Sequence, residues 1–194
     1  MISLTRIALG LWATLLVAVG SSLTASHWST LPGPTAADPA LVASVEANRL
    51  PSEAGQWLAL HVLYTECRCS QRIFEDMLAS PRPDGVTERV LLIGEDSALA
   101  ARLEDHGFSL ESLTAEALGS RYAITAAPML VLADPDGAIW YAGGYTDRKQ
   151  GPVIRDRAII ENALSGQRLS SMPLFGCAVS ESLQELLDPF GLKY

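Results

Sequence analysis

The feature that most constrains the fold is an uninterrupted apolar run at residues 56–64, QWLALHVLY, which Gly55 precedes and Thr65 follows. An apolar stretch of this length, without polar residues at alternate positions, is typical of a strand that is buried on both faces of a sheet. We therefore expect this run to be the central strand of the protein.

Segments typical of helices and of strands alternate along the rest of the chain. The residue pattern predicts helices over residues 41–48, 70–78, 97–106, 113–122 and 154–164, and further strands over residues 89–93, 129–133 and 138–142. A Pro- and Gly-containing turn at residues 134–137 joins the last two strands as a hairpin. This order of elements predicts an α/β protein, in which a parallel portion has right-handed crossovers and the hairpin supplies an antiparallel edge.

The N-terminal segment is a second apolar run. Residues 7–20, IALGLWATLLVAVG, follow a single basic residue, Arg6, and with their neighbours they reach the length of a signal peptide or a minimal transmembrane helix. No good Ala-x-Ala cleavage site follows, which favours an uncleaved anchor with the rest of the chain outside the cytoplasm. We expect residues 1–25 to be a signal anchor or signal peptide and residues 26–40 to be a linker.

The charge of the chain excludes several kinds of partner. The 194 residues include 14 Lys and Arg and 22 Asp and Glu, and every acidic residue lies from Asp38 onward. A nucleic-acid partner would require a basic face, so none is expected, and the acidity also disfavours binding of the body to anionic lipid. The sequence contains no glycine-rich phosphate cradle and no nucleophile elbow, and we expect no cofactor.

The cysteines carry the candidate chemistry. Cys67-Arg68-Cys69 lies between the central strand and the helix predicted over residues 70–78, where free N–H groups and the helix dipole lower the pKa of a thiol. Arg68 reinforces this effect and Glu66 opposes it, so the net pKa shift stays open. A Cys-x-Cys disulfide closes a smaller ring than Cys-x-x-Cys, and the resulting strain predicts a more oxidising bond.

The order of elements, the cysteine pair and Ala127-Pro128 together resemble the thioredoxin-like superfamily. Residues 122–145, YAITAAPMLVLADPDGAIWYAGGY, are similar to the superfamily's run with a cis-proline that faces the cysteines. The resemblance covers residues 55–165 and implies a three-layer α/β sandwich, with a central mixed sheet and helices on both faces. It also implies thiol–disulfide exchange, in which Pro128 shapes the substrate groove.

The Cys-x-Cys pair departs from the usual Cys-x-x-Cys and resembles uncharacterised proteobacterial relatives with Cys-Pro-Cys. With the apolar N-terminus, it also resembles membrane-tethered thiol–disulfide proteins of the bacterial periplasm. This resemblance implies a single-pass inner-membrane protein with its domain in the periplasm, or a periplasmic protein if the N-terminus is cleaved, and a partner protein that carries a thiol or disulfide. We expect the thioredoxin-like domain over residues 41–170 and a C-terminal extension over residues 171–194, with a short amphipathic helix at residues 180–187.

Each cysteine has an expected role. Cys67 is predicted to be the attacking thiol, since it comes first and should be the more exposed, and Cys69 is predicted to resolve the mixed disulfide. Cys177 has two interpretations: it is an accessory thiol that resolves a mixed disulfide, or a buried thiol that packs with Phe175 and Val179.

Two other functions stay open at the level of sequence. The cysteine pair could hold Cu(I) as a metallochaperone, with Met129 and either Cys177 or Met172 as further sulfur ligands. No histidine is well placed for this: His61 is interpreted as a core or edge residue of the first strand, and His106 ends a helix. A zinc site would lack its fourth ligand, so we assign no metal-binding residues. The other alternative is a non-catalytic interaction domain in which the cysteine pair is a vestige.

Overall fold

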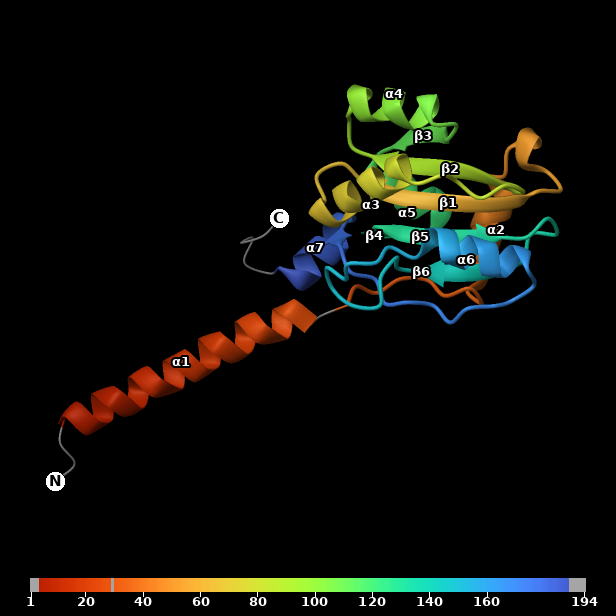
Figure 1. Cartoon of the computed structure of the whole chain (residues 1–194). Coiled ribbons are helices and arrows are strands. Elements are labelled where there is room, and N and C mark those ends of the chain that lie inside the picture. Colours follow the sequence, from red (N-terminus) through yellow and green to blue (C-terminus); the bar gives the residue numbers. More distant parts are fainter. Residues whose placement is uncertain (1–3, 29, 189–194) are drawn as a thin grey trace. The chain divides into compact units, whose positions relative to one another are not determined.

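The computed structural model describes residues 4–28 and 30–188. The other residues, which belong to the predicted anchor, linker and C-terminal extension, lie outside the described part of the chain. The chain divides into two compact units, Met1–Thr30 and Leu31–Tyr194, and the second unit is called the body below. All the described strands lie in the body (Figure 1).

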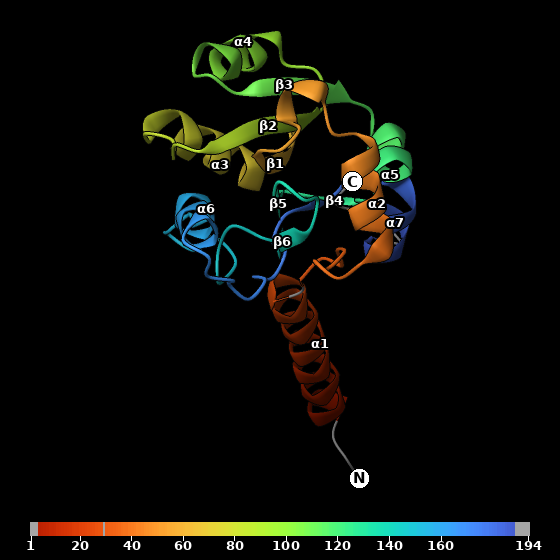
Figure 2. The same cartoon turned by 90° about the vertical axis from the view of Figure 1, so that its right-hand side faces the viewer.

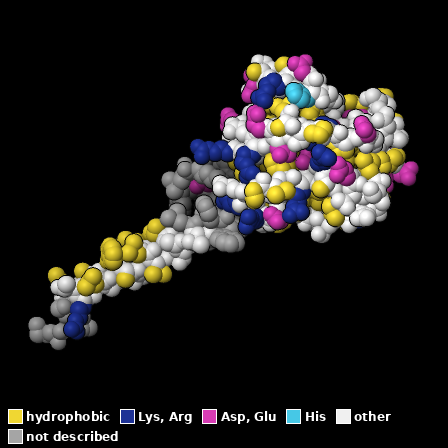
Figure 3. All heavy atoms as spheres, viewed as in Figure 1, with side chains coloured by type: hydrophobic (Ala, Val, Ile, Leu, Met, Phe, Trp, Pro, Cys, Tyr) yellow, Lys and Arg dark blue, Asp and Glu magenta, His cyan; other side chains and the backbone are white. Residues whose placement is uncertain are grey.

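The first unit consists of one helix, α1 (Leu4–Trp28). Its segment Leu4–Ser22 has a mean hydropathy of 1.6, and hydrophobic side chains such as Leu11 and Val17 are exposed along it (Figure 3). By length and composition this helix could cross a membrane, and a signal sequence has the same character. The predicted N-terminal hydrophobic helix is confirmed, and its use as an anchor or a signal stays a prediction.

The body is built on a mixed five-stranded sheet with the strand order β3-β2-β1-β5-β6. The strands are β1 (Trp57–Tyr64), β2 (Val86–Ile93), β3 (Ser109–Leu113), β5 (Met129–Ala133) and β6 (Ile139–Gly143). β2 is parallel to β1 and to β3, whereas β5 is antiparallel to β1 and to β6. The predicted parallel portion and antiparallel hairpin are therefore confirmed.

Helices cover both faces of this sheet (Figure 2). One face packs against α2 (Pro39–Ala47) and α5 (Ala115–Tyr122), and the other against α3 (Arg68–Ala79), α4 (Ser97–Asp105) and α6 (Asp156–Leu164). β1 contributes to both apolar cores, with Leu60 and Val62 in one and Ala59 and Leu63 in the other. Because successive side chains of a strand point to opposite faces, a strand that is covered on both sides is apolar throughout. This is the three-layer thioredoxin-like α/β arrangement.

The prediction was wrong in the region of β3. Ser109–Leu113 is an edge strand that pairs only with β2, and its half-buried sequence SLESL has no apolar run to mark it. The helix predicted over residues 113–122 begins later, at Ala115. Thr114 caps this helix, since its side chain accepts a hydrogen bond from Ala117 N at 3.2 Å.

A second, two-stranded sheet lies beside the main one. β4 (Ala126–Ala127) pairs antiparallel with β7 (Cys177–Ala178), and α7 (Glu181–Leu187) follows. Strands of two residues leave no periodic pattern, which is why the sequence did not predict them. Leu183 of α7 packs with Ala126 and Ala178 in a small apolar cluster, so the helix expected at residues 180–187 docks on the body.

Part of the segment predicted as a linker packs on the body. Leu31 N donates to Leu174 O at 2.9 Å, and both Leu31 and Ala36 contact the apolar core. Gly33 lies so near Leu174 that a Cβ at position 33 would be 2.1 Å from Leu174 Cδ1. The segment from Leu31 to Ala36 is therefore held by tertiary contacts, which the Pro- and Gly-containing composition did not reveal.

Candidate active site

Cys67 lies at the junction of β1 and α3, where it is the N-cap residue of the helix. Thr65 N donates to Ile93 O at 2.9 Å, and Ser70 Oγ accepts a hydrogen bond from Tyr64 N at 3.0 Å. The first bond ties the end of β1 to β2, and the second ties it to the first turn of α3. The sulfur of Cys67 is consequently held at the helix N-terminus, as the sequence predicted.

The proline segment lies directly against this cysteine. The Ala127–Pro128 peptide bond is cis, which confirms the prediction for this position. Cys67 Sγ lies 3.9 Å from the carbonyl oxygen of Ala127. The tertiary structure therefore brings the proline segment and the cysteine pair together.

The third cysteine reaches the same place. In the β4–β7 pair, Cys177 lies opposite Ala127, and its thiol hydrogen-bonds to that of Cys67. Gly176 permits this close approach, because a Cβ there would lie 2.0 Å from Ala127 O and 2.4 Å from Pro128 Cδ. Of the two interpretations of Cys177, the structure favours a thiol that faces the cysteine pair.

The exposure of the cysteines is the reverse of that expected. Cys67 is fully buried, whereas Cys69 and Cys177 are half-buried. The expectation that Cys67 would be the more exposed thiol was therefore wrong. Cys67 is buried because the tertiary structure places β4 and β7 over the N-terminus of α3.

Hydrogen bonding lowers the pKa of the Cys67 thiol. The largest cause is the hydrogen bond from the Cys177 thiol and the next is that from Cys69, and together they outweigh burial, which raises the pKa. The backbone N–H groups of Ser70 and Cys69 lower the pKa further, as expected at a helix N-terminus. Cys67 is therefore the thiolate of the group.

The pKa of Cys69 moves in the opposite direction. Its hydrogen bond to Cys67 raises the pKa most and burial adds to this, while the positive charges of Arg72 and Lys149 act against both. Cys69 also lines a small cavity of about 20 Å³ together with Pro128 and other residues. Cys69 thus keeps its proton and donates it in a hydrogen bond to the Cys67 thiolate.

Glu66 does not act mainly on the thiols. Its carboxylate accepts a hydrogen bond from the hydroxyl of Tyr64 at 2.8 Å, and this bond raises the pKa of Tyr64 to about 12. The sequence left open whether Arg68 or Glu66 would have the larger effect on the pKa of Cys67. Neither residue is among the main causes of its lowered pKa, and the largest of these causes are the hydrogen bonds from the neighbouring thiols.

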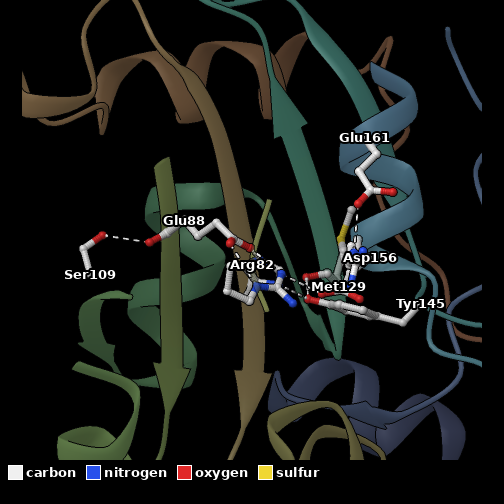
Figure 4. Close-up of polar contacts among 9 residues, drawn as sticks. Arg82, Glu88, Ser109, Met129, Tyr145, Asp156 and Glu161 are labelled. Atoms are coloured by element: carbon white, nitrogen blue, oxygen red, sulfur yellow. Dashed lines mark hydrogen bonds and ion pairs between the residues drawn. The ribbon is translucent and has the colours of Figure 1, made fainter. Parts of the chain in front are cut away.

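A second buried polar cluster lies within the core between the sheet and α6. His61 Nε2 is 2.9 Å from Glu88 Oε2, and His61 Nδ1 is 3.0 Å from the hydroxyl of Tyr145. Figure 4 shows Arg82 between Glu88 and Asp156: Arg82 Nε donates to Glu88 at 3.0 Å and its Nη2 donates to Asp156 at 2.8 Å. These five residues are called the His61 network below.

Sequence reasoning found only one member of the His61 network. His61 was interpreted as a core or edge residue, and it is fully buried in the core. A histidine inside an apolar strand signals a buried partner, since an unpaired polar group there is costly. The partner Glu88 was hidden because it lies on a neighbouring strand. Burial raises the pKa of Glu88, but hydrogen bonds from His61 and Arg82 outweigh it and lower the pKa to about 2.

The two methionines suggested as further copper ligands lie in apolar surroundings, whereas Cys177 lies beside Cys67. Met129 packs in the core that includes α2 and α5, and Met172 packs against the core on the other face of the sheet. Within the part of the chain that the structure describes, no group of three or more His, Cys, Asp and Glu side chains is placed to hold a metal ion. The Cu(I) alternative therefore stays a prediction.

Comparisons with known proteins add structural likeness only. No family model and no curated protein matches the chain. It is similar to a hypothetical protein from Sinorhizobium meliloti 1021, with 18% identity, 66% of this chain and 80% of that chain covered, and a TM-score of 0.46. It is also similar to a secreted Mycobacterium tuberculosis disulfide oxidoreductase, with 17% identity, 45% of this chain and 69% of that chain covered, and a TM-score of 0.38. A third similar structure is the thioredoxin domain of a thiol-disulfide oxidoreductase from Bacteroides vulgatus. The identity is 16%, the alignment covers 57% of this chain and 83% of that chain, and the TM-score is 0.35.

Proposed function

We propose that the protein is an extracytoplasmic thiol–disulfide oxidoreductase that exchanges thiols and disulfides with a partner protein. The observation that carries this proposal is the convergence of three thiols beside Pro128, with the pKa of Cys67 lowered by the other two. A thiolate held at a helix N-terminus, with further thiols in contact, has what disulfide exchange requires.

Cys67 is the nucleophile of the proposed reaction. Its thiolate attacks one sulfur of the partner's disulfide, so that a mixed disulfide forms and the other partner sulfur leaves as a thiolate. A second thiol of this chain then attacks the Cys67 sulfur, and the partner leaves with both sulfurs reduced. The partner gains two electrons, and this chain loses two in forming an intramolecular disulfide. The same steps in reverse donate a disulfide to a partner dithiol.

Pro128 and its neighbour have a positioning role in this proposal. Ala127 O lies beside the sulfur of Cys67, and Pro128 lines the same small cavity as Cys69. The backbone of this segment thus forms one wall of the groove in which a partner's disulfide would approach Cys67.

We also propose that α1 anchors the protein in the bacterial inner membrane as a single span, with the body in the periplasm. If α1 is cleaved as a signal, the body is released into the same compartment. The exposed apolar surface of α1 and the basic residue Arg6 near its start support this orientation. Disulfides persist in such an oxidising compartment, which fits an exchange function.

The test uses the full-length chain in detergent micelles, equilibrated in glutathione redox buffers. Free thiols are then alkylated and any disulfide is located by peptide mass spectrometry. We expect a reversible disulfide that includes Cys67, with a potential between about −120 and −270 mV, the span of dedicated oxidoreductases. Thiols that stay reduced in every buffer would contradict the proposal. A bond with a potential below about −300 mV would be a structural disulfide instead.

A further inference from the structure

The C-terminal segment at residues 173–179, called the strap below, is held over the candidate active site at both ends of β7. Before β7, Leu174 O accepts the hydrogen bond from Leu31 N at 2.9 Å, and after it Val179 N donates to Thr125 O at 2.8 Å. The two-residue strand β7 between these bonds pairs with β4. The strap is therefore a built part of the body and not a loose tail.

Two glycines make room for the strap. A Cβ on Gly144 would lie 2.1 Å from Pro173 O, and a Cβ on Gly176 would lie 2.0 Å from Ala127 O. Both close approaches are to backbone atoms, which cannot turn aside as a side chain can. Any residue larger than glycine at position 176 would push β7 away from β4.

This arrangement closes access to Cys67. Cys177 lies opposite Ala127, and the carbonyl oxygen of Ala127 lies 3.9 Å from Cys67 Sγ. Cys67 itself has no exposed surface, so a partner's disulfide cannot reach its sulfur while β7 is in place. The thiol of Cys177 occupies the position beside Cys67 that an incoming sulfur would need.

Cys69 is less suited than Cys177 to close a disulfide with Cys67. Cys67 caps α3 and Cys69 lies inside its first turn. Cys67 itself has non-helical backbone angles, and the thiols of both Cys69 and Cys177 hydrogen-bond to it. A Cys67–Cys69 bond would close the small, strained Cys-x-Cys ring at the start of α3, whereas a Cys67–Cys177 bond would join two separate segments of the chain.

We propose that Cys177 is the resolving thiol of the exchange reaction and that β7 is a movable strand, which leaves Cys67 to admit a partner disulfide and returns to resolve the mixed disulfide. The proposal rests on the exchange function proposed above. In the resolving step, the Cys177 thiolate attacks the Cys67 sulfur, the Cys67–Cys177 bond forms, and the Cys67–partner bond breaks. The partner sulfur leaves as a thiolate and takes up the proton that Cys177 released. Cys69 stays reduced throughout.

The test compares wild type, Cys69→Ser and Cys177→Ser as full-length chains in detergent micelles. Each reduced protein is mixed with oxidised glutathione, quenched by alkylation at successive times and mapped by mass spectrometry. Wild type and Cys69→Ser should both end with a Cys67–Cys177 disulfide. Cys177→Ser should accumulate the Cys67–glutathione mixed disulfide and resolve it about 100-fold more slowly, because it has lost a positioned intramolecular thiol.

The outcomes separate this inference from the function on which it rests. If wild type forms a Cys67–Cys69 disulfide and Cys177→Ser resolves at the wild-type rate, the inference is overturned while exchange at Cys67 stands. If Cys67 forms no mixed disulfide and no intramolecular disulfide in any of the three proteins, the proposed function fails and this inference fails with it.

A second variant tests the movement of β7 while it keeps all three thiols. Gly176→Ala should displace β7, so that glutathione reacts with Cys67 several-fold faster and the following closure to Cys177 slows. Gly119→Ala is the matched control, since a Cβ at position 119 would meet no atom within 4 Å, and both of its rates should equal those of wild type. Rates for Gly176→Ala that match those of Gly119→Ala would overturn the role of β7.

Discussion

The body contains two clusters of polar and thiol side chains, and they are built in opposite ways. In the His61 network, Arg82 forms ion pairs with Glu88 of β2 and Asp156 of α6, and the Asp156 side chain is only 1% exposed. The thiol cluster consists of Cys67, Cys69 and Cys177, which are linked by hydrogen bonds. Cys177 belongs to the two-residue strand β7. Breaking a buried ion pair leaves a charge without a partner at large cost, whereas the bonds of a thiol cluster change when a disulfide forms. We therefore expect the first cluster to stabilise the fold and the second to carry the proposed chemistry.

The two clusters lie near each other. The hydroxyl of Tyr145 bonds to His61, and the same residue lines the small cavity that contains Cys69 and Pro128. Variants in the His61 network and variants in the thiol cluster can therefore show whether the stability of the fold and the exchange reaction depend on separate residues.

The largest expected effect is the loss of exchange in Cys67→Ser. A hydroxyl at this position cannot form the mixed disulfide, so the reaction with oxidised glutathione at residue 67 should disappear while the midpoint of urea unfolding stays close to that of wild type. Cys177→Ser is the control, because it keeps the first attack. Exchange that persists in Cys67→Ser would show that another thiol is the nucleophile.

Arg82→Met should produce the largest loss of stability. It leaves the carboxylates of Glu88 and Asp156 buried without their shared cation, at an expected cost of about 3–5 kcal/mol in the free energy of unfolding. Urea denaturation of the full-length chain measures this cost. The control is Arg102→Met, which removes an exposed pair with Glu75 and should cost about 0–1 kcal/mol. Equal losses in the two variants would mean that the His61 network does not stabilise the fold.

Acid should weaken the His61 network through Glu88. Its pKa is about 2 in the folded protein against an ordinary value of 4.5, so its stabilisation is fully present above pH 4.5 and is lost as the pH falls toward 2. Urea denaturation at a series of pH values, in wild type and in Glu88→Gln, tests this. Below pH 4.5 wild type should lose more stability than the variant does. Parallel curves for the two proteins would contradict the assignment.

Tyr145→Phe should have the smallest effect. It removes the hydroxyl that bonds to His61, and the expected cost is about 1 kcal/mol in the free energy of unfolding. Tyr64→Phe is the control, since it removes an exposed hydroxyl that bonds to Glu66 and should change the stability by about 0.5 kcal/mol or less. A loss at Tyr145 as large as that of Arg82→Met would show that the network depends on this hydroxyl.

Local sequence patterns alone determined most of the secondary structure of the body. The apolar run of β1, the hairpin of β5 and β6, and the helices from α2 to α6 follow from periodicity and turn chemistry, because these act between residues that are near in the chain. The position of the cysteine pair at a helix N-terminus and the cis bond at Pro128 were also predictable, on the residues quoted for the thioredoxin-like resemblance.

Only the tertiary structure decided which groups meet and which are buried. The pairing of β4 with β7 places Cys177 opposite Ala127, and strands of two residues have no sequence pattern from which such a pairing could be predicted. The burial of Cys67 follows from that pairing, and the partners of His61 follow from the packing of β2 and of Tyr145 against β1. Burial and hydrogen bonding sum contributions from segments far apart in the chain, and so the sequence could name the reactive residues while the fold decided how each one is placed.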